Sequence, residues 1–322
     1  MIEVVQYEER HKRPWDDFVS QAKNGVFLFQ RDYMEYHADR FRDRSLLFFV
    51  AEKLIGVLPA NLAEDALVSH GGLTFGGVVT NTRMRAGTML EIFETLREYL
   101  RAQGIGRLLY KPVPYIYHDV PAEEDLYALF RQNARLVRRD LSTTVRQSAR
   151  PGLTKGRKWS LKQGRSHGIE VRRSEDFKTF MAMETEVLQT KYGKLPVHTA
   201  AEIALLAGRF PEYIKLFGAF KDEVMLAGVI IYESRNVAHA QYIATTDQGK
   251  QLAALDLILD FLINEHYATK DYFDFGVSTQ DDGRYLNAGL AEHKESFGGR
   301  AVVYDTYELT VQIRLWSSTT AK

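Results

Sequence analysis

The sequence of 322 residues contains no cysteine, which excludes disulfide bonds, thiolate metal sites and a cysteine nucleophile. It also has no net charge, because 42 lysines and arginines balance 42 aspartates and glutamates. A generic nucleic-acid-binding protein is therefore not expected, although a local basic patch is compatible with this balance.

Long apolar segments are also missing. No uninterrupted apolar run approaches the roughly 18 residues of a membrane-spanning helix, and the first residues, MIEVVQYEERHKRPWDDF, lack the apolar core of a signal peptide. We therefore expect a soluble, cytoplasmic protein without a membrane span. Hydrophobic residues make up 45% of the chain, which is ample for packed cores. At about 150 residues per domain, the length favours two domains.

The most informative pattern lies between residues 238 and 300. A predicted strand, Val237–Thr246, ends in the polar segment Asp247–Gln251. A helix is predicted over 251–267, because apolar residues recur there at helical spacing, at Leu252, Leu255, Ile258, Leu259 and Leu262. The first turn of a helix has unpaired N–H groups and a partial positive charge. Gly249 would allow close approach of the backbone and Lys250 adds a charge, so this turn is a candidate anion site.

The elements around this turn follow a characteristic order. Before the strand and helix described above, we predict a helix at Phe177–Tyr192 and a hairpin of Tyr213–Phe220 and Val224–Glu233. After them, we predict a short strand at Tyr272–Phe275, a second helix at Leu286–Phe297 and a last strand at Ala301–Leu309. This succession resembles the GNAT acyltransferase superfamily, which implies a mixed α/β fold and coenzyme A as acyl-CoA donor, with no metal. The superfamily's turn usually reads Gln/Arg-x-x-Gly-x-Gly/Ala, whereas this chain has QGKQLA. The resemblance implies cofactor binding by Gln248, Gly249, Lys250 and Gln251.

The first half of the chain shows a similar order of elements. VSHGGLTFGGVV at 68–79, within a predicted strand Leu67–Val79, falls where VAHAQYIATTDQ falls at 237–248, with His70 opposite His239. We therefore predict two GNAT-like domains in tandem, at residues 1–150 and 151–322. The first has no basic residue beside a glycine comparable to Lys250, so we expect it to bind no cofactor. We expect it to serve the acceptor side through His70, Lys111 and Tyr115.

The paired halves resemble the Fem-type transferases and, more closely, acyltransferases found with bacterial surface-polysaccharide genes. The phrases that carry this resemblance are SHGGLTFGG, YKPVPYIYH, PAEEDLYALFR, PVHT, FDFG and LNAGLAEHKESFGGR. The resemblance implies transfer of an acyl group from acyl-CoA to the amino group of a nucleotide-linked amino sugar, in O-antigen or capsule biosynthesis.

One region has unbalanced charge. Residues 131–173 contain thirteen lysines and arginines against two acidic residues. A helix is predicted over Gly152–Gln163, with Lys158 and Lys162 one turn apart. Such a run is compatible with a solvated helix face or a linker. It is equally compatible with a phosphate-facing wall that binds the substrate.

Direct attack of an amine on a thioester requires a general base but no protein nucleophile. The candidates for the base are His239, His198, Glu184 and His70. His239 shares a strand face with Gln241, which makes Gln241 a candidate substrate contact. Histidine titrates in the required range without much adjustment.

Four further residues are candidates near the leaving thiolate or the substrate. Ser278 and Tyr285 follow the short strand, and Tyr285 is our candidate for the group that protonates the thiolate. Asn287 either contacts pantetheine or caps the next helix. Asp274 orients a histidine, binds a sugar hydroxyl or pairs with a lysine.

Two other functions fit the same sequence. A Fem-type enzyme would use aminoacyl-tRNA and a peptidoglycan precursor, and would explain the basic segment as an RNA contact. A non-catalytic binding protein with a degenerate second GNAT site would explain the imperfect glycine turn. A homodimer is compatible with each of the three.

Overall fold

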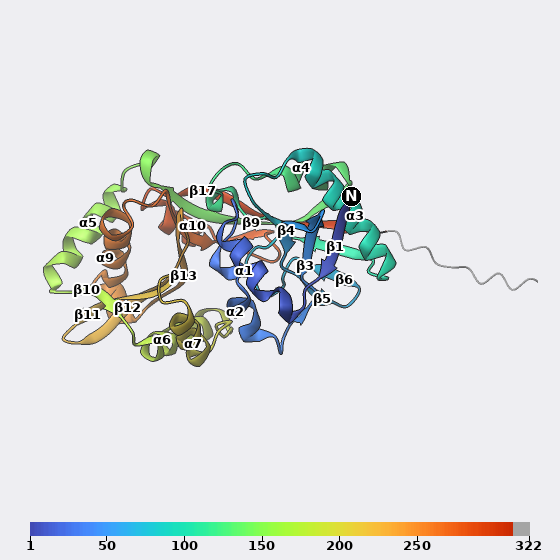
Figure 1. The fold of residues 1–322 in the computed structure, drawn as a ribbon. Coiled ribbons are helices and arrows are strands. Elements are labelled where there is room, and N and C mark those ends of the chain that lie inside the picture. The colour runs from blue at the N-terminus through green and yellow to red at the C-terminus, as the bar shows by residue number, and fades with distance from the viewer. Residues whose placement is uncertain (312–322) are drawn as a thin grey trace, which may run out of the picture. The chain divides into compact units, whose positions relative to one another are not determined.

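A computed structural model describes residues 1–311 (Figure 1). The chain forms two compact units. The first comprises Met1–Arg139 and the described residues from Tyr304 onwards, and the second comprises Asp140–Val303. The division falls inside two strands, β9 (Arg135–Arg146) and β17 (Arg300–Thr310). It differs from the predicted boundary at residue 150, because no linker composition marks a division that lies within strands.

In the first unit, one sheet has the antiparallel order β1-β3-β4-β7. A second set of strands has the order β17-β8-β6-β5-β2, in which β6 and β8 run parallel. The bounds of these strands are β1 Ile2–Gln6, β2 Arg42–Asp43, β3 Leu46–Val50, β4 Lys53–Leu58, β5 Asn61–Ala63, β6 Ala66–Val68, β7 Val79–Thr80 and β8 Arg107–Tyr110. The helices are α1 Lys12–Ser20, α2 Arg31–Met34, α3 Ala86–Ala102 and α4 Glu124–Arg131.

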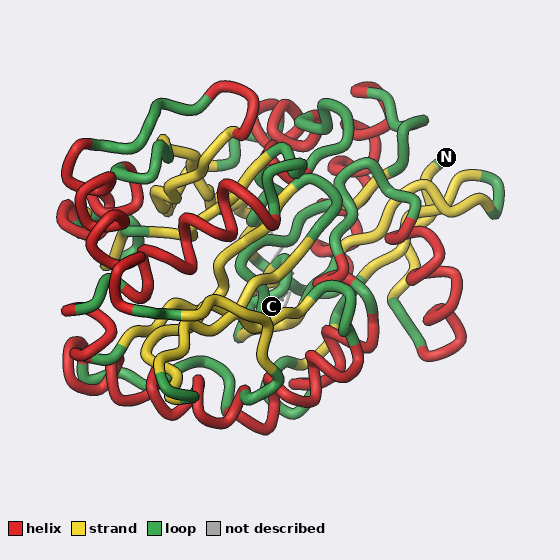
Figure 2. Tube along the Cα trace, turned by 90° about the vertical axis from the view of Figure 1, so that its left-hand side faces the viewer, coloured by secondary structure: helices red, strands yellow, loops and turns green. Residues whose placement is uncertain are grey.

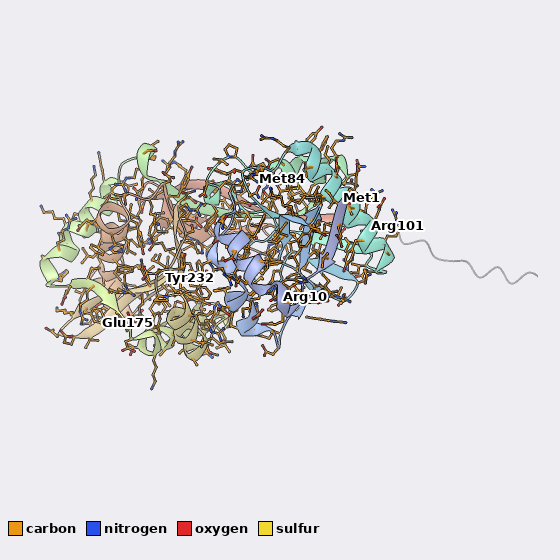
Figure 3. The ribbon with its side chains drawn as sticks, in the orientation of Figure 1. Met1, Arg10, Met84, Arg101, Glu175 and Tyr232 are labelled. Carbon is orange, nitrogen blue, oxygen red and sulfur yellow. The ribbon has the colours of Figure 1, made fainter. Side chains whose placement is uncertain are left out.

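The core of the first unit is built on α3. This helix buries apolar residues spaced three and four apart and packs against β1 and α4, with Met89, Ile92, Phe93, Leu96 and Leu100 buried. Met84, labelled in Figure 3, belongs to the same core cluster.

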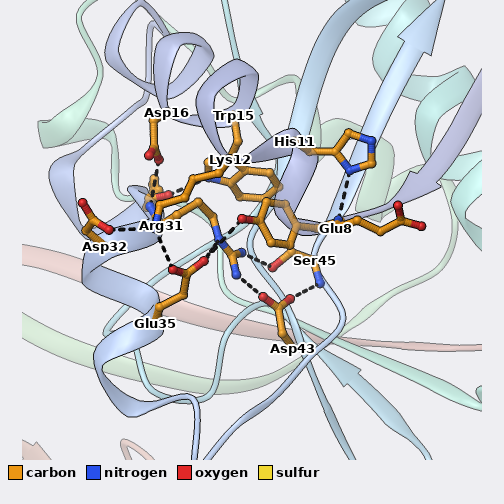
Figure 4. A network of polar contacts seen from close by, with 12 residues as sticks. Glu8, His11, Lys12, Trp15, Asp16, Arg31, Asp32, Glu35, Asp43 and Ser45 are labelled. Atoms are coloured by element: carbon orange, nitrogen blue, oxygen red, sulfur yellow. Dashed lines mark hydrogen bonds and ion pairs between the residues drawn. The ribbon is translucent and has the colours of Figure 1, made fainter.

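A network of charges joins α1 and α2 to β2 (Figure 4). The guanidinium of Arg31 is buried, lies over the ring of Tyr7 at 3.6 Å, and donates from Nε to Glu35 Oε1 at 3.0 Å. It also donates to Asp43 and to Ser45 Oγ. Because each donor has an acceptor, this buried cation is compensated.

The second unit contains the sheet order β10-β11-β12-β13-β14-β9, in which β13 and β14 run parallel and the other neighbours antiparallel. The strands are β10 Glu170–Ser174, β11 Ile214–Lys221, β12 Val224–Glu233, β13 Val237–Thr245 and β14 Tyr272–Val277, with a small hairpin of β15 Thr279–Gln280 and β16 Tyr285–Leu286. The helices are α5 Lys155–Gly164, α6 Phe177–Tyr192, α7 Ala200–Arg209, α8 Asp247–Gln251, α9 Ala254–Phe261 and α10 Ala288–Glu295. The predicted mixed α/β class is confirmed (Figure 2).

Helices α6 and α9 cover opposite faces of this sheet. Val229 and Ile231 of β12 belong to the core cluster that contains α9, whereas a Cβ at Gly228 would lie 2.5 Å from Phe180 of α6. Successive strand residues point to opposite faces, so the two helices lie on different sides. Glycine at position 228 lets α6 approach β12 closely.

Two predictions about local structure are wrong. The predicted strand Leu67–Val79 is two short strands, β6 and β7, joined by a loop at 69–78. The segment 247–267 is α8, a break at Ala253 in the left-handed region (φ +56°), α9 and a π-helical turn at Leu262–His266, instead of a polar loop followed by one helix. Within residues 1–311, no helix is both long and apolar enough to cross a membrane.

Each unit contains a parallel strand pair, and the registers of the two pairs differ from the alignment that the sequence predicted. The β6–β8 ladder ends at Val68↔Leu109, and the β13–β14 ladder ends at His239↔Asp274. Aligning the two ladders on their first pairs places Val68 where His239 lies. His70, which we predicted opposite His239, is therefore not its counterpart.

Candidate active site

Strands β13 and β14 separate soon after they begin. Their ladder covers the pairs Val237↔Tyr272, Ala238↔Phe273 and His239↔Asp274, although β13 continues to Thr245. Beyond the ladder, Gly276 has a φ of +75°, a conformation that favours glycine. The parallel strands therefore open into a gap at their carboxyl ends.

A cavity of about 710 Å³ lies at this gap. Ala240, Gln241 and Ile243 of β13 and Phe275 and Val277 of β14 line it, with further residues from α6, α8, α9 and α10. All of its lining residues belong to the second unit. We call the part of this cavity that lies between β13 and β14 the slot, and its concave shape is typical of a small-molecule site.

His239 and Asp274 form a pair at the point where the strands separate. His239 Nδ1 lies 2.7 Å from Asp274 Oδ2, and the side chain of His239 is 13% exposed. His239 itself does not line the cavity, but the residues that follow each member of the pair, Ala240 and Phe275, do. If Asp274 accepts the Nδ1 proton, Nε2 is the nitrogen that can take another.

Asp274 is fully buried, and its carboxylate oxygens are satisfied by protein groups. Oδ1 accepts hydrogen bonds from Ser142 Oγ at 2.6 Å and Thr144 Oγ1 at 2.7 Å. Burial alone would raise the pKa of Asp274, but the bonds from His239, Ser142 and Thr144 outweigh it and lower the pKa to about 2. Asp274 is therefore placed to orient His239, and its carboxyl group is buried outside the cavity lining.

Lys294 of α10 was missed in the sequence. It is 4% exposed, lines the cavity, and donates from Nζ to the carbonyl oxygens of Gly276 at 2.7 Å and Val277 at 2.9 Å. Burial lowers its pKa to about 8. It thus binds the carbonyls where β14 departs from β13. The only signal in the sequence was a lysine inside LNAGLAEHKESFGGR.

The predicted anion turn is short helix α8. Thr246 caps it by accepting from the Gly249 N–H at 2.9 Å, and Lys250 Nζ lies 2.5 Å from Asp247 Oδ1. Gly249 and Lys250 line the cavity, and so does Lys191 of α6. The Gly249 N–H already donates a hydrogen bond to Thr246, so it is not available to an anion. An anion at this end of the cavity would instead bind the side chains of Lys191 and Lys250.

Gly249 is required by packing. A Cβ at this position would lie 2.3 Å from the carbonyl oxygen of Leu226 and 2.5 Å from Thr245 Oγ1. We expect Gly249→Ala to cost about 1–3 kcal/mol of unfolding free energy, as overpacking does, and to displace α8 from the cavity. Chemical denaturation measures this.

Gly208→Ala is the matched control, because a Cβ there would meet no atom within 4 Å. It is expected to leave stability unchanged or to raise it by up to about 1 kcal/mol. Equal stability of the two variants would show that the close approach at Gly249 is not required.

The other base candidates lie in different surroundings. Glu184 of α6 lines the cavity and is 6% exposed, and burial raises its pKa to about 7. His198 is 5% exposed, and its Nδ1 lies 2.6 Å from the hydroxyl of Tyr242, a lining residue. His198 itself lies outside the lining, so it supports the wall.

Among the remaining predicted residues of the second unit, two line the cavity and six do not. Gln241 lines it, and so does Asn287, whose side chain also caps α10 by accepting from the Leu290 N–H at 3.1 Å. The six outside the lining are Gln248, Gln251, Ser278, Tyr285, Lys158 and Lys162. Ser278 is buried and Tyr285 is 55% exposed. Lys158 and Lys162 lie on the exposed side of α5.

The predicted substrate residues of the first unit hold a loop. Lys111 Nζ donates to the carbonyl oxygens of His70, at 2.7 Å, and of Leu73. Burial lowers the pKa of Lys111 to about 7 and that of His70 to about 3. Lys111 thus fixes the loop 69–78 next to the β6–β8 ladder. Tyr115 is 52% exposed.

Comparison with known proteins defines the fold. No protein-family model matches the chain, and no curated protein matches it in sequence. The solved structure of FemX matches with a TM-score of 0.67 at 11% identity, over 96% of this chain and 97% of FemX. L-PGS from Bacillus licheniformis matches with a TM-score of 0.58 at 10% identity, over 88% of this chain and 93% of that chain. A tandem GNAT protein from the clavulanic acid biosynthesis pathway matches with a TM-score of 0.48 at 11% identity, over 97% and 99%.

The chain has a mixed α/β fold, as the sequence predicted, and it shares this fold with FemX and L-PGS. The match to FemX covers almost the full length of the chain.

Proposed function

We propose that the chain is an N-acyltransferase that moves an acyl group from coenzyme A to an amino group. The observation that carries the proposal is the His239–Asp274 pair, which lies at the closed end of the slot between β13 and β14. A base beside a slot for an extended thioester is the arrangement that direct aminolysis needs.

His239 acts as the base in this proposal. The amine nitrogen attacks the thioester carbon while His239 Nε2 takes an amine proton. As the C–N bond forms the C–S bond breaks, and the imidazolium returns the proton to the sulfur, which gives an amide and a free thiol. Asp274 stabilises the imidazolium through Nδ1.

The residues of the cavity fit an anionic donor. Lys191 and Lys250 line the cavity near α8, and apolar side chains such as Phe275 and Leu259 line it together with polar and charged residues. Two cations favour phosphate groups, whereas apolar walls suit a pantetheine arm. Asp247 pairs with Lys250 and partly offsets its charge.

The acceptor we propose is the amino group of a nucleotide-linked amino sugar of surface-polysaccharide biosynthesis. This choice rests on the resemblance carried by phrases such as SHGGLTFGG and LNAGLAEHKESFGGR. Gln241, which lies at a bulge of β13 against β12 and lines the cavity, offers an amide for acceptor hydroxyl groups.

Thiol release tests this function. The protein is incubated with acyl-CoA donors and a panel of nucleotide-linked amino sugars, and free thiol is followed with a colour reagent. We expect release that depends on both substrates. A donor that raises the melting temperature but releases no thiol with any acceptor would contradict the acceptor proposal. If coenzyme A does not change the melting temperature, a non-catalytic binding protein is favoured.

A second candidate is a Fem-type transferase that uses aminoacyl-tRNA. The exposed Lys158 and Lys162 on α5 and the likeness to FemX favour it. Retention of tRNA at physiological salt, together with no affinity for coenzyme A, would select this candidate.

A further inference from the structure

Glu184 is an unusual residue in the wall of the cavity. It lies on α6, and residues 184, 187, 188 and 191 of this helix line the cavity together. The spacing of three and four residues places these side chains on one helix face. The next two lining residues of α6, Val187 and Leu188, are apolar. Glu184 is therefore the polar lining residue in this part of α6.

The carboxyl group of Glu184 has an unsatisfied oxygen. The side chain is 6% exposed, and Oε2 is fully enclosed with no hydrogen-bond partner among residues 1–311. Burial is the cause of the raised pKa of about 7, and no neighbouring cation lowers it. A buried carboxyl group without a partner costs free energy. A leucine at this position would remove that cost, so the protein alone does not explain the carboxyl group.

We propose that Glu184 binds a hydrogen-bond-donating substituent of the acyl group, a hydroxyl or an amino group, and so selects a substituted acyl donor over a plain one. The inference rests on the proposed function, because that function places the thioester in the cavity. The acyl group is then the part of the donor that lies among the cavity walls, beyond the cations at α8. A substituent there can donate a hydrogen bond to the carboxyl group of Glu184, whose side chain lines the cavity.

The two possible substituents differ in their dependence on pH. A hydroxyl group can donate to a carboxylate or accept from a carboxylic acid, so protonation of Glu184 leaves a hydrogen bond in place. An ammonium group pairs only with the carboxylate. Because the pKa of Glu184 is about 7, binding of an aminoacyl donor weakens as the pH falls below 7, whereas binding of a hydroxyacyl donor persists.

Calorimetric titration of the full chain tests the proposal. The probes are the coenzyme A thioesters of butyrate, 3-hydroxybutyrate and 3-aminobutyrate, each titrated at pH 6 and pH 8. One substituted thioester is expected to bind wild type about 10- to 100-fold more tightly than butyryl-CoA, as a hydrogen bond to a carboxylate implies. Glu184→Leu is expected to lose this preference while it still binds butyryl-CoA. Glu186→Leu, a change at an exposed position of the same helix, is expected to keep it.

The melting temperature of the ligand-free variants gives a second measurement. Glu184→Leu is expected to melt at or above the wild-type temperature, because an unsatisfied carboxyl group is removed. A lower melting temperature with equal loss of all three thioesters would identify Glu184 as structural and overturn the inference. Equal binding of the three thioesters by wild type would overturn it while leaving the proposed function intact. If none of the thioesters binds, both are overturned.

Discussion

Replacement of His239 with glutamine is expected to lower kcat/KM for acyl transfer by about 10²- to 10⁴-fold, the usual loss when a general base is removed. Glutamine keeps a polar side chain next to Asp274 but takes no proton at neutral pH. The effect is expected mainly in kcat, since His239 does not line the cavity that holds the donor. Steady-state rates of thiol release measure it.

Two further variants separate the base from its neighbours. Asp274→Asn is expected to lower kcat strongly as well, because the amide donates a hydrogen bond where His239 needs an acceptor. His198→Gln is expected to change kcat less than about tenfold, because the Nδ1 of His198 is bonded to the hydroxyl of Tyr242 and the residue supports the wall instead of lying where β13 and β14 separate. If His239→Gln keeps wild-type kcat, the pair is not the catalytic base.

Replacement of Arg31 with methionine is expected to lower the free energy of unfolding by about 1.5–3 kcal/mol, because it removes charge-assisted hydrogen bonds to Glu35 and Asp43, whose side chains are 29% and 37% exposed. Arg31 is 2% exposed and binds Glu35 and Asp43 while it lies over Tyr7. Methionine has a similar length but no charge and no donors. Denaturant titration followed by circular dichroism measures the change.

Arg13→Met is the control for this prediction. Arg13 lies 3.8 Å from Asp17, and both side chains are largely exposed, at 92% and 66%. Exposed pairs of this kind contribute about 0–1 kcal/mol. A loss for Arg31→Met as small as that for Arg13→Met would show that the network in Figure 4 adds little stability.

Elements with a clear local period were predictable from the sequence. The helix Phe177–Tyr192 and the strand Val224–Glu233 agree with the structure at both ends. In these segments the apolar period, the Asp176 cap and Gly193 at the helix end all act within a few residues.

Long-range contacts explain the predictions that failed. The loop 69–78 looked like a strand because its apolar residues alternate. In the structure a Cβ at Gly76 would lie 2.2 Å from the Ser69 carbonyl oxygen, and Lys111 holds the loop from another strand. The bond from Lys111 to His70 joins residues about forty apart in the chain, and no local pattern encodes it.

The sequence predicted several residues of the candidate site but not which of them form a hydrogen-bonded pair. The sequence offered four base candidates, and His239 and Asp274 are 35 residues apart. Only the register of β13 against β14 brings them together. The role of Lys294 depends on carbonyl groups that are released where the strands separate, so no spacing in the sequence marks it.

A structure with coenzyme A and the amino sugar both bound tests the account most directly. The deciding measurement is the distance from the acceptor nitrogen to His239 Nε2. We expect the pantetheine arm between β13 and β14 and a distance of about 2.6–3.2 Å. An acceptor nitrogen closer to Glu184 or His198, or a donor bound away from these strands, would contradict the account.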